Sequence, residues 1–282
     1  MRPLLFSLIF ALTANCASAQ TTIERQYLPD VTLDFPEFSD HDATSSVIVD
    51  NSAWNEFLST YLSIGPNGVA LVNYGGVSDD DAAALNGYIT YLEGLDPTTL
   101  TSDDQLAFWI NLYNARTIKL ILDNYPTPSI RKIKIGGGLN FAGPWDKVFV
   151  TVSGQQLSLN DIEHKVIRAV FDEPRIHYAV NCASIGCPSL KDEAYEGVTI
   201  DRQLNEAASD FVNHPRGIRV DNGRVTASKI FNWYREDFGT NEEAILNHVR
   251  LFANDELTSA LEGKTSIRKY EYDWSLNDNT AN

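Results

Sequence analysis

Residues 106–122, LAFWINLYNARTIKLIL, decide the fold because they form a long run that is apolar nearly all round. A helix with apolar side chains on every side lies inside a domain rather than on its surface. Residues 102–105, SDDQ, precede the run and fit a capping box, and two prolines follow it at 126 and 128. We therefore expect a buried central helix over 101–123.

Shorter periodic patterns flank the central helix on both sides. Helical spacing of apolar residues predicts helices over 51–62, 78–92, 160–171, 201–213, 228–237 and 242–252. Ser153-Gly154 and Asn222-Gly223 predict the turns of two β-hairpins, and the runs 69–74, 175–182 and 267–274 predict strands. This order of elements is typical of the α+β class. We expect a single compact domain whose buried central helix packs on a small, mostly antiparallel sheet that includes 175–182.

The first residues have the pattern of an export signal rather than of a folded element. Arg2 precedes a short apolar stretch, and Ala17-Ser18-Ala19 has the small-x-small pattern of a signal peptidase site. We expect a signal peptide at 1–19, a loose acidic leader at 20–48, a globular domain at 49–277 and a tail at 278–282. No later run suits a membrane span, which takes roughly 20 apolar residues. The predicted location is the periplasm or the extracellular space.

The formal net charge of -16 at pH 7 limits the partners of the protein. Loss of the predicted signal removes one positive charge, that of Arg2, and no acid, so -16 becomes -17. Such a surface repels phosphate backbones and anionic membranes. We expect no nucleic-acid partner, and a small molecule or a peptide as the substrate.

Two asparagines interrupt the apolar run of the central helix. Asn111 and Asn114 lie about one turn apart, so they share a face of the predicted helix. A buried amide costs a few kcal/mol unless it is fully hydrogen-bonded. The two side chains either clamp a neighbouring loop or form one wall of a ligand pocket.

A second polar group lies in and after the helix predicted at 160–171. Asn160 and Glu163 fit a capping box, which explains Glu163 without any function. His164 follows near the helix N-terminus, where the dipole favours the neutral imidazole that a general base needs. If 175–182 is a regular strand, His177 and Cys182 point to opposite faces, and His164 is the better partner for the thiol. If the strand ends near Asn181, His177 becomes a candidate again.

Cys182 and Cys187 are the two cysteines that remain after removal of the predicted signal. In an oxidising compartment they could close a small disulfide ring, or one could be a working thiol beside a bystander. A cysteine near a histidine is the minimal nucleophile and base pair. Two histidines and two cysteines within this stretch could also bind zinc. A redox dithiol is the less favoured interpretation because that chemistry usually uses the C-x2-C spacing.

Several motifs together resemble the family known as domain of unknown function five-four-seven. They are AFWINLYNA at 107–115, IEH at 162–164, RIHYAVNCAS at 175–184 with Cys187-Pro188, KIF at 229–231 with Asp237-Phe238, and YDWSLN at 272–277. The resemblance covers roughly residues 50–277 in the same order. The family name states no activity. The resemblance implies that a recurring set of polar residues acts together: Asn111, Asn114, Glu163, His164, His177, Asn181 and Cys182.

The leading hypothesis is a thiol-dependent hydrolase or acyl-transfer enzyme that acts on an amide or ester. Cys182 would attack, His164 or His177 would take its proton, and Glu163 would orient the imidazole. The candidate substrate-binding residues are Asn111, Asn114, Asn181 and Ser184. We expect no cofactor. The alternatives are a non-enzymatic ligand-binding module with a Cys182–Cys187 disulfide, and a zinc site built from His164, His177 and Cys182.

Overall fold

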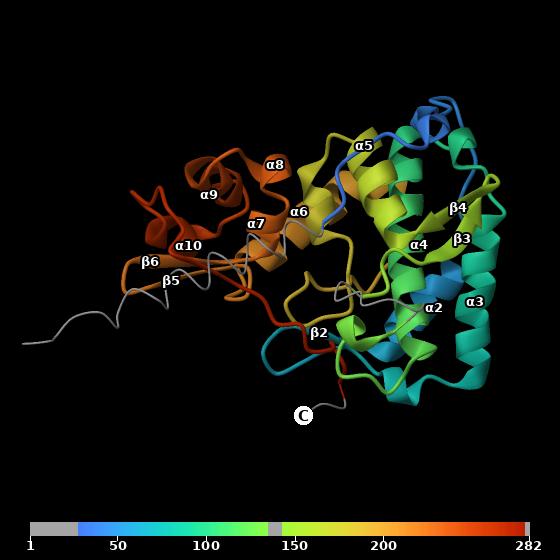
Figure 1. Ribbon diagram of the computed structural model, residues 1–282, viewed down its shortest axis with the longest axis horizontal. Coiled ribbons are helices and arrows are strands. Elements are labelled where there is room, and N and C mark those ends of the chain that lie inside the picture. Colours follow the sequence, from blue (N-terminus) through green and yellow to red (C-terminus); the bar gives the residue numbers. More distant parts are fainter. Residues whose placement is uncertain (1–27, 135–142, 280–282) are drawn as a thin grey trace, which may run out of the picture.

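The computed structural model describes residues 28–134 and 143–279, which form a helix-rich α+β structure. The predicted signal peptide lies outside the described residues. Within the described ranges there are nine α-helices and three small sheets. In Figure 1 the helix α4 lies between α3 and the later segments, which are coloured yellow to orange. The α+β class expected from the sequence is confirmed.

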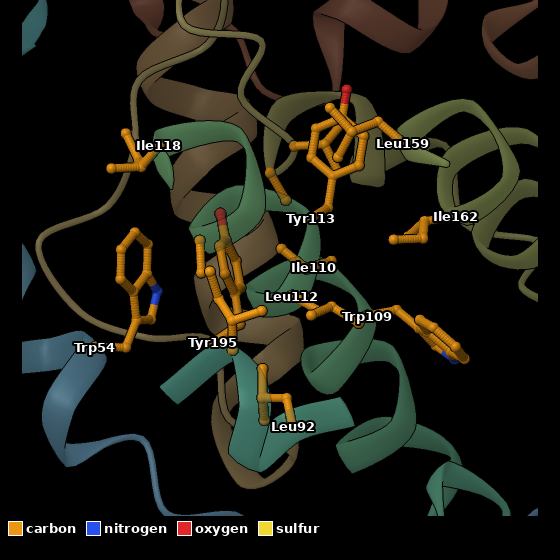
Figure 2. Packing of buried hydrophobic residues seen from close by; sticks show 14 of the residues in the cluster. Trp54, Leu92, Trp109, Ile110, Leu112, Tyr113, Ile118, Leu159, Ile162 and Tyr195 are labelled. Carbon is orange, nitrogen blue, oxygen red and sulfur yellow. The ribbon is translucent and has the colours of Figure 1, made fainter. Parts of the chain in front are cut away.

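Helix α4 (Ser102–Leu122) is the buried centre of the larger apolar core, as predicted. Every residue from Gln105 to Ala115 is buried, and Figure 2 shows side chains leaving the helix toward several sides. The predicted cap was wrong by one residue. Thr101 is the N-cap, and its hydroxyl accepts from the Asp104 amide at 3.2 Å while donating to the Asp104 carboxylate at 2.6 Å. Thr101 serves because a threonine hydroxyl caps a helix as a serine hydroxyl does.

Neighbouring helices cover α4. The helix α3 (Asp79–Glu93) contacts it along one side, and α2 (Ser52–Tyr61) packs against α3. The acidic leader also contributes, because Phe38 in the 3-10 turn Pro36–Ser39 is fully buried with its ring edge-on to Trp109 at 4.9 Å. The core around α4 therefore includes part of the segment before residue 49.

The three sheets are small and mostly antiparallel. Strands β1 (Leu62–Ile64) and β2 (Ala70–Val72) form one pair, and β3 (Val148–Val152) and β4 (Gln155–Ser158) form another. The third sheet joins the hairpin of β5 (Ile218–Asp221) and β6 (Arg224–Ser228) to β7 (Lys269–Glu271), which runs parallel to β6.

Both predicted hairpin turns are confirmed by their backbone conformation. Ser153 and Gly154 have φ of 49° and 82°, and Asn222 and Gly223 have φ of 50° and 73°. Two successive residues with positive φ are the mark of a type I′ turn, which matches the twist of the strands it connects.

A second apolar cluster lies beside the first and is built from the later helices. These are α6 (Ile200–Val212), α7 (Ile230–Trp233), α8 (Arg235–Phe238), α9 (Glu242–Arg250) and α10 (Asp255–Ala260). The single helix predicted over 228–237 is two short helices, because Tyr234 leaves the helical conformation between them. Trp274 packs against both clusters.

The strand predicted at 175–182 was wrong. Pro174–Tyr178 is a 3-10 turn, followed by irregular backbone up to Cys182. The backbone amides find partners without a neighbouring strand: Ala179 N bonds to Ile176 O at 2.9 Å, and Asn181 N bonds to the Asn114 side chain at 2.8 Å. The run is apolar because it is buried, and periodicity alone does not separate a buried turn from a buried strand. The central helix consequently meets turns here, not the expected sheet.

The helix α5 (Arg168–Val170) continues a seven-residue π-helix at Asp161–Ile167, so the helix predicted at 160–171 is present with unusual winding. Across the described ranges we find no helix with the length and apolar character needed to cross a membrane.

Candidate functional site

A cavity of about 400 Å3 lies where the two apolar clusters meet. Cys182, Cys187, His164, His177 and Glu163 all line it. Six of the other fourteen lining residues are aromatic and come from both clusters: Tyr113, Trp145, Trp233, Tyr234, Tyr272 and Trp274. The fold therefore brings the predicted thiol, both histidines and the glutamate to one cavity.

The π-helix presents Glu163 and His164 to this cavity. The predicted cap of Asn160 with Glu163 was wrong, because Ser158 caps the helix by accepting from the Asp161 amide at 3.1 Å. The Asp161 carboxylate accepts in return from the Ser158 amide at 2.9 Å and the Ser158 hydroxyl at 2.6 Å. The Glu163 side chain therefore does not cap the helix, and it lies buried in the cavity wall. Short π-helical segments next to α-helical turns occur frequently at functional sites.

His164 is neutral, but one of its two ring nitrogens is occupied. Nδ1 lies 2.9 Å from Arg168 Nη1, and because a guanidinium only donates, Nδ1 accepts and Nε2 carries the proton. Burial, reinforced by the Arg168 charge, lowers the pKa of His164 to about 4. The lone pair on Nδ1 therefore already accepts a hydrogen bond from Arg168, which makes His164 a poor proton acceptor.

His177 is held by a carboxylate that lies 60 residues further along the chain. Its Nε2 is 2.6 Å from Asp237 Oδ2, and Arg168 binds the same carboxylate through Nε at 2.6 Å and Nη2 at 2.9 Å. Burial opposes the ionisation of Asp237, but these hydrogen bonds hold the pKa of its carboxyl well below the ordinary value. An ionised carboxylate only accepts, so Nε2 of His177 carries the proton.

The other nitrogen of His177 has no partner among the residues that the structure describes. His177 Nδ1 is buried, and the nearest acid is Glu163, whose Oε1 is 4.0 Å away and is also without a partner. Burial lowers the pKa of His177, although Asp237 acts in the opposite direction. The Tyr234 ring stacks on the imidazole at 4.0 Å, and the Tyr234 side chain hydrogen-bonds Glu163. The result is a neutral imidazole with an available lone pair at Nδ1.

Asp237 was not among the predicted site residues. The signal that could have found it is its position in the family motifs, where Asp237-Phe238 follows KIF. Glu163 was expected to orient the imidazole, whereas the carboxylate hydrogen-bonded to His177 belongs to Asp237.

Asn111 and Asn114 each bridge backbone groups with both ends of the amide. Asn111 donates to Tyr195 O at 2.8 Å and accepts from Tyr195 N at 2.9 Å. Asn114 donates to Ala179 O at 2.9 Å and accepts from Asn181 N at 2.8 Å. These contacts match the loop clamp that the sequence left open as one alternative, and neither side chain lines the cavity. Their assignment to substrate binding stays a prediction.

The loop that carries the thiols is closed by its own first residue. Asn181 donates to Pro188 O at 2.6 Å and accepts from Ala183 N at 2.8 Å. Ala183 has φ of 56°, a left-handed conformation that is uncommon for alanine and that turns the chain sharply after Cys182. The amide of Asn181 thus shapes the loop from 181 to 188, so its predicted role toward substrate also stays untested.

The two thiols touch each other inside this loop and are free, not joined as a disulfide. Cys182 Sγ lies 2.9 Å from Cys187 Sγ, 2.9 Å from the Tyr272 hydroxyl and 3.4 Å from Ser184 Oγ. The Cys187 hydrogen bond, with help from Ser184 and Tyr272, lowers the pKa of the Cys182 thiol against the opposing effect of burial. Burial raises the pKa of the Cys187 thiol. Cys182 is half-buried and Cys187 is buried, so Cys182 is the more accessible thiol and also the one whose pKa is lowered.

The predicted thiol and base share the cavity without a direct bond. In the described part of the chain, no hydrogen bond joins Cys182 to an imidazole nitrogen. Catalytic contacts of this kind are often long in an unliganded enzyme and tighten when substrate binds. Within residues 28–134 and 143–279, no three His, Cys, Asp or Glu side chains are grouped so that they could hold a metal ion, and this includes His164, His177 and Cys182.

Residues 97–212 match the model of a family described as a protein of unknown function, DUF547. A DUF547 domain thus lies at residues 97–212. The resemblance is thereby confirmed for the motifs at 107–115, 162–164 and 175–188, whereas those at 229–231, 237–238 and 272–277 lie beyond the match. No curated protein and no solved structure matches the chain.

The DUF547 domain supplies only one part of the cavity. Glu163, His164, His177 and both thiols lie within the matched residues. Asp237, Tyr272 and the two tryptophans Trp233 and Trp274 lie after residue 212. The site as a whole therefore depends on the segment that follows the DUF547 match.

Proposed function

We propose that this protein is a thiol-dependent hydrolase or acyl-transfer enzyme that attacks an amide or ester with Cys182. One observation carries the proposal. A half-buried thiol, hydrogen-bonded by Tyr272, lines the same cavity as a buried imidazole whose Nδ1 lone pair has no partner among the described residues. A thiol activated by its neighbours and a free imidazole lone pair are the two components of nucleophilic catalysis by cysteine.

His177 is the base in this proposal, and Asp237 is its positioning residue. The Asp237 carboxylate keeps the proton on Nε2, so Nδ1 is the atom that accepts the thiol proton. Glu163 faces Nδ1 from 4.0 Å and favours the imidazolium that results. His164 is less suitable because Arg168 already donates to its acceptor nitrogen.

The proposed reaction proceeds in two steps through an acyl-thioester on Cys182. The Cys182 sulfur bonds to the carbonyl carbon of the substrate, the bond to the amine or alcohol breaks, and the leaving group takes the proton from His177. Water then attacks the thioester in a hydrolase, or a second amine or alcohol attacks it in a transferase. His177 accepts the proton of that nucleophile, and Cys182 regains a proton as it leaves.

The cavity wall offers hydrogen-bond donors for the substrate carbonyl. The indole N–H groups of Trp233 and Trp274 are buried, and neither has a hydrogen-bond partner within the described ranges. Both side chains line the cavity, and their rings pack together at 5.5 Å. We propose these indole groups as the donors to the substrate carbonyl. The side-chain amides of Asn111, Asn114 and Asn181 are less suitable because they already bond to backbone groups. The aromatic surroundings favour an apolar or aromatic acyl group. The predicted signal makes a compartment outside the cytoplasm part of this proposal.

A screen of chromogenic esters and fluorogenic amides with apolar acyl groups tests the proposal. We expect Cys182→Ser to abolish turnover, and we expect mass spectrometry to find an acyl adduct on the tryptic peptide 176–191 of the wild type. His177→Gln should slow turnover by about 10²–10⁴-fold. His164→Gln is the matched control and should have a much smaller effect. Unchanged turnover in Cys182→Ser, or an acyl adduct on any other residue, would overturn the proposal.

A further inference from the structure

The sulfur-to-sulfur contact between Cys182 and Cys187 points to a second kind of chemistry. The C-x4-C spacing argues against a redox dithiol, because that chemistry usually uses C-x2-C. The fold removes this objection. The loop from 181 to 188 folds back on itself and places the two sulfurs 2.9 Å apart, so a disulfide of roughly 2.05 Å needs only a small further approach.

The loop is built so that both sulfurs are held together before any reaction. Asn181 ties its two ends by bonding Ala183 N and Pro188 O. Inside it, Cys187 N bonds to Ser184 O at 3.1 Å, and Cys187 Sγ lies 3.0 Å from the amide of Cys182. Because the loop is already closed, forming the disulfide costs little further chain entropy.

The two thiols also differ in access in the way that an exchange reaction requires. Cys182 is half-buried and faces the cavity, so an external disulfide can reach it. Cys187 also lines the cavity but is only 4 % exposed, and its sulfur contacts Cys182. An incoming disulfide therefore meets Cys182 first, and the mixed disulfide forms next to Cys187.

We propose that this site also performs thiol–disulfide exchange, in which Cys182 attacks an external disulfide and Cys187 resolves the product. In the first step the Cys182 thiolate bonds to one sulfur of the external disulfide, and the other sulfur leaves as a thiolate that takes up the proton lost by Cys182. In the second step Cys187 loses its proton and attacks Cys182, and the remaining external sulfur leaves and is protonated. The external disulfide is reduced to two thiols, and the protein is oxidised to a Cys182–Cys187 disulfide.

The substrate class for this activity is a small, neutral disulfide with apolar groups. The cavity is about 400 Å3 and its wall is mainly apolar, with six aromatic residues, which favours apolar substituents. The net charge of -16 repels anionic disulfides such as oxidised glutathione. This activity uses the proposed nucleophile but does not depend on hydrolysis.

The test treats the reduced, native protein with the neutral probe hydroxyethyl disulfide at pH 7. Samples are quenched with acid at successive times, and the tryptic peptide 176–191 is weighed by mass spectrometry, which leaves Cys16 out of the measurement. We expect a peptide with a single mercaptoethanol adduct at early times. This peptide should convert to one that carries no adduct and is lighter than the reduced peptide by two hydrogens.

Two variants separate the steps. Cys187→Ser should stop at the mercaptoethanol adduct on Cys182, and Cys182→Ser should react at least about tenfold more slowly, because a buried thiol of raised pKa is a weak attacker. The wild-type time course needs no variant, so the test stands even if a variant fails to fold. A stable adduct on the wild type, an adduct that forms first on Cys187, or thiols that react only after unfolding in urea would each overturn the proposal.

The disulfide test and the screen of esters and amides are separate experiments, so exchange and hydrolysis can succeed or fail independently. An internal disulfide without any acyl adduct would support exchange and count against hydrolysis. An acyl adduct without an internal disulfide would do the reverse.

Discussion

At the scale of single residues, partners decide which chemistry a side chain can perform. His164 and His177 are both buried imidazoles with lowered pKa values, yet only His177 has a ring nitrogen left over for a substrate proton. Arg168 accounts for the difference. It occupies Nδ1 of His164 and at the same time fixes the carboxylate of Asp237 that binds His177.

The thiol of Cys182 gives the first residue-scale prediction. Tyr272→Phe removes a hydrogen bond of 2.9 Å and so raises the pKa of the Cys182 thiol. Because only the thiolate reacts, the rate of iodoacetamide labelling at pH 6 should fall about tenfold, since a hydrogen bond to a charged group contributes about 1.5 kcal/mol. Above the thiol pKa the two proteins should label at similar rates.

Tyr270→Phe is the matched control for that experiment, because Tyr270 lies in β7 and precedes Tyr272 by two residues. Equal slowing in both variants would contradict a specific role of the Tyr272 hydroxyl. Labelling is followed by mass spectrometry of the peptide 176–191.

The ion pair of Arg168 with Asp237 gives the second prediction at the scale of single residues. The Arg168 side chain is 5 % exposed, so Asp237→Asn leaves a nearly buried guanidinium without its countercharge. The free energy of unfolding should fall by about 3 kcal/mol, as expected when one partner of a buried pair is removed. Asp201→Asn breaks an exposed pair with Arg175 and should cost about 1 kcal/mol or less. Urea denaturation of both variants measures the contrast, and equal losses would contradict it.

At the scale of elements, the central helix acts as a scaffold for the two loops beside it. Asn111 and Asn114 are its polar residues, and each satisfies one donor and one acceptor of a buried loop backbone. Asn114 holds the loop that leads into Cys182, whereas Asn111 holds the backbone of Tyr195. The π-helix is a second element that shapes the site. Ser158 and Asp161 form its cap, so the Glu163 side chain is left to face the cavity.

The two asparagines form a natural pair of test and control. Asn114→Ala should lower the free energy of unfolding by about 2–4 kcal/mol, because two buried backbone groups lose their partners. It should also slow labelling of Cys182, since the loop before the thiol is released. Asn111→Ala should cost a similar free energy but leave the labelling rate of Cys182 unchanged.

Urea denaturation and iodoacetamide labelling under native conditions provide both readouts. If Asn114→Ala changed only the Michaelis constant for a substrate and neither of these quantities, the clamp would be the wrong explanation.

At the scale of the whole molecule, the site exists because two apolar clusters meet. The cluster around α4 brings Tyr113 and Trp145, and the cluster of later helices brings Trp233 and Tyr234. Trp274 packs against both. The same meeting buries His164 and His177 in neutral form, which makes the stability of the protein depend on pH.

Stability should fall as the pH drops from about 6.5 toward 4. Burial lowers the pKa of His164 and of His248 from 6.5 to about 4, and it lowers the pKa of His177 as well. In this window the unfolded chain binds protons that the native protein does not, so the free energy of unfolding increases with pH. Between pH 7 and pH 4, protonation of His164 should lower the free energy of unfolding by roughly 3 kcal/mol. The loss from half-buried His248 is smaller.

Urea denaturation between pH 4 and pH 7 measures this slope. His164→Gln should flatten the slope, because glutamine can still accept from Arg168 but does not titrate. A wild-type protein whose stability is constant over this range would contradict the argument.

The sequence by itself determined the local structure of this protein. The central helix, both type I′ hairpins and the amphipathic helices follow from spacing, capping and turn residues, all of which act between neighbours in the chain. It also pointed to one part of the site, since the thiols, both histidines and Glu163 lie within a short stretch, whereas Asp237 and Tyr272 were not among the predicted site residues. Local patterns did not separate a buried turn from a buried strand at 175–182.

Only the tertiary structure decided which of these groups are partners. His177 meets Asp237 across 60 residues, Asn114 meets Asn181 across 67, and Cys182 meets the hydroxyl of Tyr272 across 90. Such contacts depend on the path of the chain between the partners and on the packing of two clusters, which no local pattern encodes. Even the contact of Cys182 with Cys187, five residues apart, depends on a loop whose ends are held by Asn181 and whose entry is held by Asn114.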